Sequence, residues 1–489
     1  MTVQESAATP APGIDAHRNH RWFALIVLCL GVLMIVLDTT IVNVALPSIK
    51  ADLGFTETSL AWVVNAYMLT YGGFLLLGGR LGDLYGHRRF FLVGITLFTL
   101  ASLACGLAQS QTFLVAARAI QGLGGATVTA VALSLIMDLF SEPADRAKAM
   151  GVYGFVCAGG GSIGVLLGGL LTGTLNWHWI FLVNLPIGVL VFALSLWLLP
   201  AGIKASATRS LDIAGAVTVT TSIMLATYAI VNGNEAGWTS VQTLGLLGAA
   251  AALLATFLVI ESRIASPLMP LGLFRLRNVA VANVVGVFWA AAMFAWFFLS
   301  ALYMQLVLGY APMQVGMAFL PSNLIMAAFS LGLSAKIVMR FGIRLPLFVG
   351  LMFAAVGLLL FARAPVDGKL LTDVLPGMVL LGLGAGMAFN PVLMAAMSEV
   401  GPEDSGLASG VVNTSFMMGG SLGLAVLASL AASRAARSAL EGLDRAASLA
   451  AGYRVAFFVG ALFAAFAAVF GGALLRTRDA LRTAEAGAH

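Results

Sequence analysis

The sequence predicts an all-α membrane protein, and three observations support this fold class. Of the 489 residues, 60% are apolar and only 10% are charged, and the mean hydropathy is +0.99. A soluble protein needs about 25% charged residues to solvate its surface. The apolar residues also gather in long runs, and a helix needs about 20 of them to cross the hydrocarbon core of a bilayer. A soluble enzyme and a disordered scaffold are therefore excluded.

The N-terminal residues 1–21 are polar and include Pro10, Pro12 and Gly13. They lack the charged start, short apolar core and small-residue cleavage site of a removable signal peptide. We therefore expect a cytoplasmic N-terminal tail over 1–21, followed by a first span that is not cleaved.

Fourteen spans are predicted when the chain is divided by the length needed to cross a bilayer. The connections between them are short, apart from the polar stretches 200–210, 262–278 and 431–452. Because the number of spans is even, both termini lie on one side of the membrane. The predicted spans are 22–47, 58–79, 89–108, 112–138, 147–172, 178–199, 211–231, 242–261, 279–306, 313–336, 345–363, 372–398, 406–430 and 453–475.

The basic residues indicate the orientation of these spans. With the N-terminus in the cytoplasm, eighteen of the 26 Lys and Arg residues fall in cytoplasmic segments, seven fall in outer segments and Arg118 lies within a span. The positive-inside rule therefore predicts that both termini are cytoplasmic. The net charge of +5 and the pI near 9.3 follow from this topology and do not indicate a nucleic-acid partner.

Cysteine and histidine give no sign of a disulfide framework or a metal site. Cys29, Cys105 and Cys157 are an odd number, lie far apart and fall inside apolar runs, so we expect them to be small core residues. The five histidines do not cluster in sequence with cysteines or carboxylates. The prediction is that the protein has no metal and no cofactor.

A basic, glycine-containing segment follows the second span and reads GRLGDLYGHRR from Gly79 to Arg89. Its glycines allow a tight reversal between helices, and Asp83 can cap a helix or form an ion pair. A weaker copy, RFGIR, runs from Arg340 to Arg344, which indicates an internal repeat in two halves. The residues expected to matter in the first copy are Gly79, Asp83, Gly86, Arg88 and Arg89.

Three further patterns lie inside spans. Span one contains LDTTIVNVALP around Asp38, and span four contains RAIQGLGGA starting at Arg118. Span five contains GGSIGVLLGG, in which Gly160, Gly164 and Gly168 recur every four residues. One face of that helix is nearly bare backbone, which permits close helix packing, and Gly169 adjoins it.

Together these patterns resemble the major facilitator superfamily, and more narrowly its fourteen-span drug:proton antiporter family (EmrB/QacA-like exporters). Two further matches are WHWIFLVNLP from Trp177 to Pro186 and GLASG from Gly406 to Gly410. The resemblance extends over nearly the whole chain, and the patterns fall in the family's order.

The resemblance implies the major facilitator fold with alternating access to a site near the bilayer midplane. Two six-helix bundles, 22–199 and 279–475, would flank two inserted transmembrane helices over 211–261. Cytoplasmic linkers over 200–210 and 262–278 would join these parts, and 476–489 would be a cytoplasmic C-terminal tail.

The sequence departs from the family pattern in three places. Leu84 and His87 stand where basic residues are common, and Val165 stands where span five usually has proline. That proline is associated with antiport, so its absence weakens the antiport assignment. In span eleven of the major facilitator numbering, Phe416 and Met417 replace a common Arg-Gln pair, which favours a lipophilic substrate.

Asp38 is the only acidic residue deep within a predicted span. A charge at the membrane centre costs roughly 2.5–3.5 kcal/mol on insertion scales, so it persists where it has a partner or a role. Asp38 lies about 13 Å and Arg118 about 9 Å from the outer ends of their spans, which predicts a direct or water-bridged contact. Our hypothesis is that Asp38 takes the coupling proton and Arg118 tunes its proton affinity. The alternative is a permanent structural ion pair.

The substrate-contacting wall is predicted from polar, aromatic and flexible side chains in the spans. Aromatic rings and methionines suit varied apolar ligands, although each residue alone is more often a packing residue. The candidates are Trp62, Asn65, Tyr67, Gln121, Trp296, Phe297, Tyr303, Asn390, Asn413, Phe416 and Met417.

The leading prediction is a secondary active exporter of hydrophobic drugs or natural products, driven by the proton gradient, in a bacterial plasma membrane. Its expected partners are a hydrophobic small molecule, protons and membrane lipid, and recruitment of a periplasmic adaptor protein is left open. The alternative is a lipid or amphiphile translocator that is not strictly proton-coupled. No clustered catalytic groups and no ATP-binding loop are found in the sequence, so an enzyme or an ATP-driven pump is not expected.

Overall fold

The computed structural model describes residues 12–56, 58–140, 142–199, 212–264, 267, 269, 271–363, 365–400 and 405–476. Within these ranges every regular element is a helix. The predicted linker 200–210 and most of the predicted C-terminal tail lie outside the described residues. The helices, three of them (η2, η3 and η4) of π type and η1 of 3₁₀ type, are α1 Pro12–Leu53, α2 Ala61–Tyr85, α3 His87–Gly106, α4 Gln111–Leu139, α5 Pro143–Thr174, α6 Trp179–Leu182, α7 Asn184–Leu198, α8 Ile213–Ala236, α9 Val241–Arg263, η1 Leu271–Arg275, α10 Arg277–Leu302, η2 Tyr303–Val307, α11 Pro312–Ala328, η3 Phe329–Leu333, α12 Ser334–Phe341, α13 Arg344–Phe361, η4 Leu370–Val374, α14 Leu375–Met397, α15 Ser405–Leu440 and α16 Arg445–Leu474.

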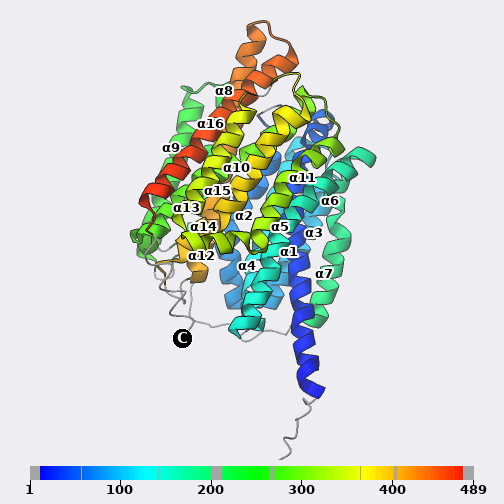
Figure 1. Cartoon of the computed structure of the whole chain (residues 1–489), viewed down its shortest axis with the longest axis vertical. Coiled ribbons are helices and arrows are strands. Elements are labelled where there is room, and N and C mark those ends of the chain that lie inside the picture. The colour runs from blue at the N-terminus through cyan, green and yellow to red at the C-terminus, as the bar shows by residue number, and fades with distance from the viewer. Residues whose placement is uncertain are drawn as a thin grey trace, which may run out of the picture.

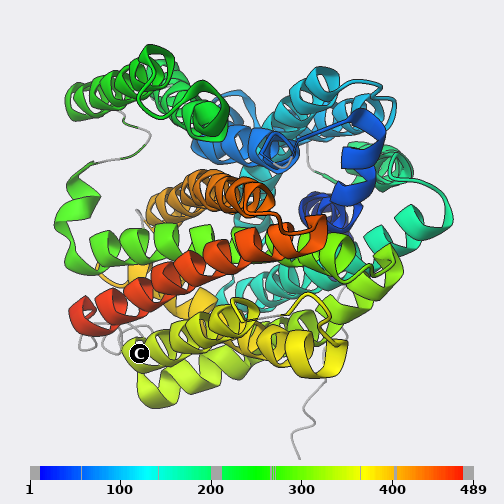
Figure 2. The ribbon, with the colours of Figure 1, turned by 90° about the horizontal axis from the view of Figure 1, so that it is seen from above.

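Helix packing separates an N-terminal group, α1–α7, from a C-terminal group, α10–α16. In the first group α1 packs on α5 and α7, and α4 packs on α2 and α3. In the second group α10 packs on α15 and α16, and α13 packs on α14 and α16. The two groups meet where α5 contacts α11 and where α2 contacts α15. The view from above shows them side by side, with α8 and α9 at one edge, where α8 packs on α2 and α15 and α9 packs on α8 (Figure 2).

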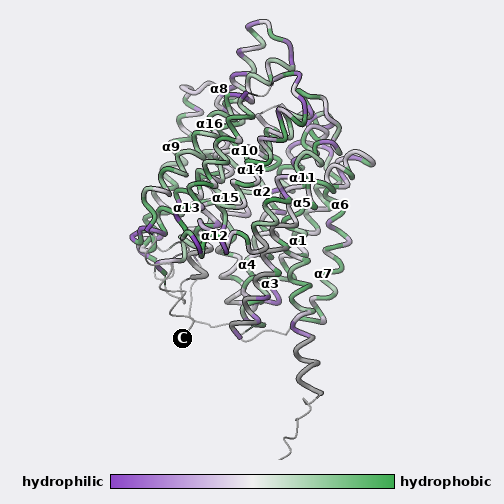
Figure 3. Tube along the Cα trace, in the orientation of Figure 1, coloured by the Kyte–Doolittle hydropathy of each residue, from purple (hydrophilic) through white to green (hydrophobic). Residues whose placement is uncertain are grey.

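The surface of this bundle is suited to lipid. Eleven helices in the described part of the chain are long and apolar enough to cross a membrane. The other three predicted spans also lie on helices, namely α2, α5 and the run from α11 to α12. Hydrophobic residues follow the middle of the helices, and hydrophilic residues gather near their ends (Figure 3). The protein is therefore an all-helical membrane protein.

In Figure 1, α1 begins at the end of the molecule that lies below, and α15 and α16 meet at the opposite end. We call the end where α1 begins the lower end and the opposite one the upper end. α1 begins at Pro12, so residues 12–21, predicted to be a tail, are helical. Proline is favoured in the first turn of a helix because it has no N–H to leave unpaired there.

The prediction of a polar connecting stretch over 431–452 was wrong, because most of that stretch is helical. α15 continues to Leu440, α16 begins at Arg445, and the two form a hairpin that projects from the upper end (Figure 1). The chain reverses at Gly442, whose φ is +90°. Asp444 caps α16 by accepting a hydrogen bond from the Ala447 N–H at 2.7 Å. Polar composition marked the end of the apolar span but not the end of the helix.

The basic segment after span two is also mostly helical, since α2 continues to Tyr85. The reversal is confined to Gly86, whose φ of +100° is strained for any residue with a Cβ atom. The weaker copy has the same design, with Gly342 at φ +75° between α12 and α13. Both halves therefore use one left-handed glycine to turn the chain at the lower end.

Candidate functional site

Asp38 lies in the middle of α1 with no exposed surface, and its carboxylate accepts three side-chain hydrogen bonds. Arg118 Nη1 on α4 donates to Oδ2 at 2.5 Å. Gln121 Nε2, also on α4, and Asn184 Nδ2 on α7 donate to Oδ1 at 2.8 and 3.0 Å. Three helices therefore meet at one carboxylate, and the predicted contact between Asp38 and Arg118 is direct.

Arg118 is as deeply buried as its partner, at 1% exposure. Its Nε donates to the carbonyl of Val63 on α2 at 2.9 Å, and Nη1 also donates to Gln121 Oε1 at 2.6 Å. The guanidinium lies 4.3 Å from the centre of the Tyr67 ring and 5.6 Å from that of Phe181. Such cation–π contacts stabilise a desolvated cation. The guanidinium thereby links α4 to α1 and α2.

A second layer of polar groups surrounds Gln121. Its Nε2 donates to Ser102 Oγ on α3 at 2.8 Å, and its Oε1 accepts a weak bond from Cys105 Sγ at 3.6 Å. Ser102 donates in turn to the Phe98 carbonyl at 2.8 Å. Asn184 Nδ2 reaches the same Ser102 oxygen at 3.4 Å. The result is one connected network across α1, α3, α4 and α7, which is the usual condition for stable polar groups in an apolar interior.

The helix of span six is interrupted directly before Asn184. Span six, predicted as one helix, is divided into α6 and α7 at Val183. Pro186 has no N–H, so the Leu182 carbonyl cannot receive the usual helical hydrogen bond. Asn184 is the first residue of α7 and is 1% exposed.

The glycines of α5 bring that helix against the part of α1 that holds Asp38. A Cβ atom on Gly164 would lie 2.1 Å from Thr40 Oγ1 and 2.9 Å from the Leu37 carbonyl oxygen. Gly160 and Gly168 meet α1 in the same way, at Leu33 and at the Ile41 carbonyl. Gly169 points elsewhere, toward the Pro312 carbonyl on α11. The predicted packing glycines therefore serve two interfaces.

At the lower end, two residues of the basic segment contact neighbouring helices. Arg88 Nη2 donates to the Leu196 carbonyl on α7 at 2.5 Å, and His87 Nδ1 lies 2.9 Å from Asp138 Oδ2 on α4. Gly79 lies inside α2, near Ala130, and Arg89 is exposed. The side chain of Asp83 lies outside the described residues.

The predicted substrate residues do not form a single cluster. Gln121 belongs to the Asp38 network, and Tyr67 lies against Arg118. Trp296 and Phe297 pack with Phe319 inside the C-terminal group. The Tyr303 hydroxyl donates to the Pro365 carbonyl at 2.6 Å, within a connecting segment.

The remaining candidates face other helices. Phe416 on α15 contacts Phe294 and Phe389, and Met417 packs where a Cβ on Gly72 of α2 would lie. Trp62 lies near Tyr228 of α8, with ring centres 6.4 Å apart. Asn65 is fully buried, and neither atom of its amide has a hydrogen-bond partner among the described residues. Asn390 and Asn413 are half-buried on α14 and α15.

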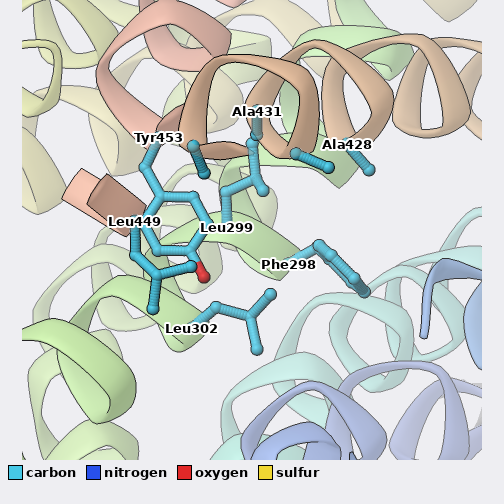
Figure 4. A pocket seen from close by; sticks show the side chains of 9 residues that line it. Phe298, Leu299, Leu302, Ala428, Ala431, Leu449 and Tyr453 are labelled. Atoms are coloured by element: carbon cyan, nitrogen blue, oxygen red, sulfur yellow. The ribbon is translucent and has the colours of Figure 1, made fainter. Parts of the chain in front are cut away.

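The pocket in Figure 4 is not large enough for a drug-sized ligand. It lies between α10, α15 and α16, and Leu302, Leu449 and Tyr453 are among its lining residues. Its interior volume of about 10 Å³ has room for one water molecule at most, whereas ligand pockets have roughly 300–1,000 Å³. Among the residues that the structure describes, no group of three or more His, Cys, Asp and Glu side chains is placed to hold a metal ion.

Comparison with known proteins decides the family. The family model described as Major Facilitator Superfamily matches residues 28–424. The chain belongs to this superfamily. Solved structures agree with this fold. A bacterial homologue of the human lysosomal transporter Spinster has a TM-score of 0.65 at 18% identity, with 95% of this chain and 98% of that chain covered.

Three curated relatives of this major facilitator protein are named for drug resistance or export. The puromycin resistance protein pur8 of Streptomyces alboniger is 38% identical, covering 94% of this chain and 91% of that protein. The cephamycin export protein CmcT of Amycolatopsis lactamdurans is 40% identical, with 86% of each chain covered. The multidrug resistance protein Stp of Mycobacterium tuberculosis is 38% identical, covering 86% of this chain and 78% of that protein. The resemblance stated from sequence motifs is confirmed.

Ser102 and Asn184 are the network residues that sequence reasoning missed. Asn184 stands inside the quoted WHWIFLVNLP segment, and Ser102 stands inside an apolar span. A buried polar residue in a span was the available signal, but serine and asparagine are common enough in helices that it did not single out these two.

Proposed function

We propose that this major facilitator protein exports hydrophobic drugs or natural products from a bacterial cell in exchange for protons. It would have fourteen spans, with the lower end facing the cytoplasm, in the plasma (inner) membrane. The relatives named for export of or resistance to puromycin, cephamycin and multiple drugs support the substrate class. The single observation that most supports the coupling is the fully buried carboxylate of Asp38, held by Arg118 in the membrane interior.

The energy source in this proposal is the proton gradient, with Asp38 as the group that takes the proton. Ionised Asp38 is stabilised by Arg118 and by two amide donors, whereas burial by itself favours the neutral acid. A proton arriving from the outer side neutralises the carboxylate and removes its attraction to the guanidinium. Since this attraction joins α1 to α4, protonation can favour a different arrangement of the two helix groups. Gln121 then acts as a holder of the carboxylate and not as a substrate contact.

The glycine and lower-end motifs have supporting roles in this proposal. Gly160, Gly164 and Gly168 keep α5 close to α1, and Gly169 and Gly316 allow α5 to meet α11. The basic segment with Gly79, Asp83, Gly86, Arg88 and Arg89 would hold the lower ends of the helices in place as the groups move. The domain scheme follows the helix groups, with α8 and α9 as the inserted pair.

The substrate would contact aromatic and methionine side chains at the interface between α2 and α15. It would also contact Trp296 and Phe297 beside α11. The described residues present no acidic side chain as deep as Asp38, so neutral, monocationic or weakly acidic amphiphiles fit better than dications.

Transport in proteoliposomes tests the proposal. The purified protein is reconstituted with a pH-sensitive dye inside and an imposed pH gradient, and puromycin and lipophilic dyes are added in turn. We expect substrate-triggered proton flux that is lost in Asp38→Asn. Substrate movement without proton flux, unchanged in Asp38→Asn, would instead support the amphiphile translocator, for which Val165 in place of the family proline is the motivating feature.

A further inference from the structure

Asn184 differs from the other groups that contact Asp38 because part of its side chain is unused. Its Nδ2 donates to Asp38 Oδ1 at 3.0 Å and to Ser102 Oγ at 3.4 Å. Its Oδ1 is buried and has no hydrogen-bond partner among the described residues. An unpaired carbonyl oxygen in an apolar interior is unfavourable, and such groups call for a physical reason.

Most of the other neighbours have no acceptor free for a hydrogen bond from the protonated form of Asp38. Arg118 has only donors. Gln121 uses Nε2 toward Asp38 and Ser102, and its Oε1 already accepts from Arg118. The Ser102 hydroxyl hydrogen is directed to the Phe98 carbonyl. Asn184 Oδ1 therefore stands free beside the carboxylate in the described network, where the buried hydroxyl of Tyr67 also has no partner.

We propose that Asn184 is a positioning residue that serves Asp38 in both of its protonation states. When Asp38 is ionised, the Asn184 amide nitrogen donates to the carboxylate, as the structure shows. When Asp38 is protonated, the amide turns by about half a rotation, and its oxygen accepts the new O–H, because an amide has its donor and acceptor on opposite sides. This inference rests on the proposed role of Asp38 as the group that takes the proton.

The turn is compatible with the surroundings of Asn184. Ser102 Oγ loses only a long contact of 3.4 Å and keeps its bond from Gln121. The charged or titratable groups that face Asp38 are Arg118 from α4, Tyr67 from α2 and Cys105 from α3. Arg118 has donors only and the Cys105 thiol donates to Gln121 Oε1, so the Tyr67 hydroxyl is the one other acceptor among these three groups. A protonated carboxyl whose O–H has no acceptor is unfavourable in the protein interior. The turn of Asn184 therefore allows both the ionised and the protonated form of Asp38.

Isotope-edited infrared spectroscopy tests the turn in the wild-type protein. The protein is labelled with ¹³C at the side-chain carbonyl of asparagine, and difference spectra are recorded between high and low pH. We expect an asparagine carbonyl band to move to lower frequency as the Asp38 carboxylic acid band appears. The band should be absent from the difference spectrum of Asn184→Leu and present in that of Asn283→Leu. Asn283 is a matched control, since its buried amide donates to the Val279 carbonyl of its own helix.

The pH midpoint of the carboxylic acid band gives a second measure. Loss of a hydrogen bond to a charged group changes a proton equilibrium by about one pH unit, or roughly tenfold in proton affinity. Because the bond to the carboxylate is the stronger of the two, Asn184→Leu should move the midpoint to higher pH. Asn184→Ser, whose hydroxyl can donate and accept, should move it less, and it replaces Asn184→Leu if the leucine variant does not fold.

The outcomes separate this inference from the proposed function. If the acid band disappears in Asp38→Asn but no asparagine carbonyl band accompanies it in the wild type, Asp38 keeps its role and the turn of Asn184 is refuted. If Asp38→Asn retains the acid band and the proton flux, the proposed function itself fails, whatever Asn184 does.

Discussion

At the scale of single residues, one guanidinium determines how the site is assembled. Arg118 donates to a carboxylate, to an amide oxygen and to a backbone carbonyl, and these acceptors come from α1, α4 and α2. Lysine has no fork of donors and cannot reach three fixed acceptors in this way. The ion pair also has no access to water, so removal of either partner leaves a charge that the interior does not solvate.

Replacement of the guanidinium should destabilise the protein through the carboxylate that it leaves unpaired. Arg118→Leu leaves Asp38 without its counter-charge, which costs about 3–5 kcal/mol. Asp38→Asn in the same chain removes that charge, so the double variant should be more stable than Arg118→Leu alone. Thermal unfolding in detergent of the single and double variants measures this, with the exposed Arg434→Leu as a control. A double variant that is less stable than Arg118→Leu would contradict the unpaired carboxylate as the cause of the loss.

At the scale of elements, glycine determines how closely α5 approaches α1. The contact is specific to individual positions, because a Cβ on Gly164 would strike Thr40 and the backbone at Leu37, whereas a Cβ on Gly173 of the same helix would meet nothing within 4 Å. Without a hydrophobic driving force between helices in lipid, such close packing is a main source of helix association.

Gly164→Ala should therefore destabilise the protein by about 1–3 kcal/mol, the usual cost of overpacking, and should reduce transport. Gly173→Ala on the same helix should change neither. Thermal unfolding and substrate-driven proton flux are measured for both variants. If the two behave alike, α1 and α5 do not need the bare glycine face.

The turn at Gly86 is a second element-scale test. Its φ of +100° strains any residue with a Cβ atom, although no neighbouring atom would obstruct the added carbon. Gly86→Ala should cost about 1 kcal/mol from backbone strain alone. Gly245→Ala, in open space within α9, should instead be neutral or slightly stabilising. The unfolding temperatures of the two variants are compared. Because an added Cβ atom meets no neighbour at either position, a difference between them reports the backbone strain at Gly86.

At the scale of the whole molecule, contacts toward the upper ends of the helices join the two helix groups. Gln305 Nε2 of η2 donates to the Val44 carbonyl of α1 at 2.9 Å, and α5 meets α11 at Gly169 and Gly316. Alternating access requires that such contacts break and form again, so their strength should set the balance between the two states.

Gln305→Ala should weaken the closed upper end. Spin labels at the exposed positions Ala51 and Gln314 report the distance between α1 and α11. We expect the distribution to broaden toward longer distances in the variant, in a background where Cys29, Cys105 and Cys157 are replaced. Labels at Ala51 and Gln109, both in the N-terminal group, should keep their distance. A distribution that does not respond would mean that this hydrogen bond does not hold the upper end closed.

The amino-acid sequence by itself determined the membrane environment, the helical runs, the family and the pairing of Asp38 with Arg118. These follow from composition, from periodic small residues and from depth along two helices, all of which are local quantities. Only the tertiary structure showed that α15 and α16 extend as a hairpin, that the turn is confined to Gly86, and that Gln121 donates to Asp38. It also brought Ser102 and Asn184 to Asp38 from sites 64 and 146 residues away. Hydrogen bonds across helices depend on the rotation of each helix about its axis, which packing fixes and which a linear pattern of residues does not encode.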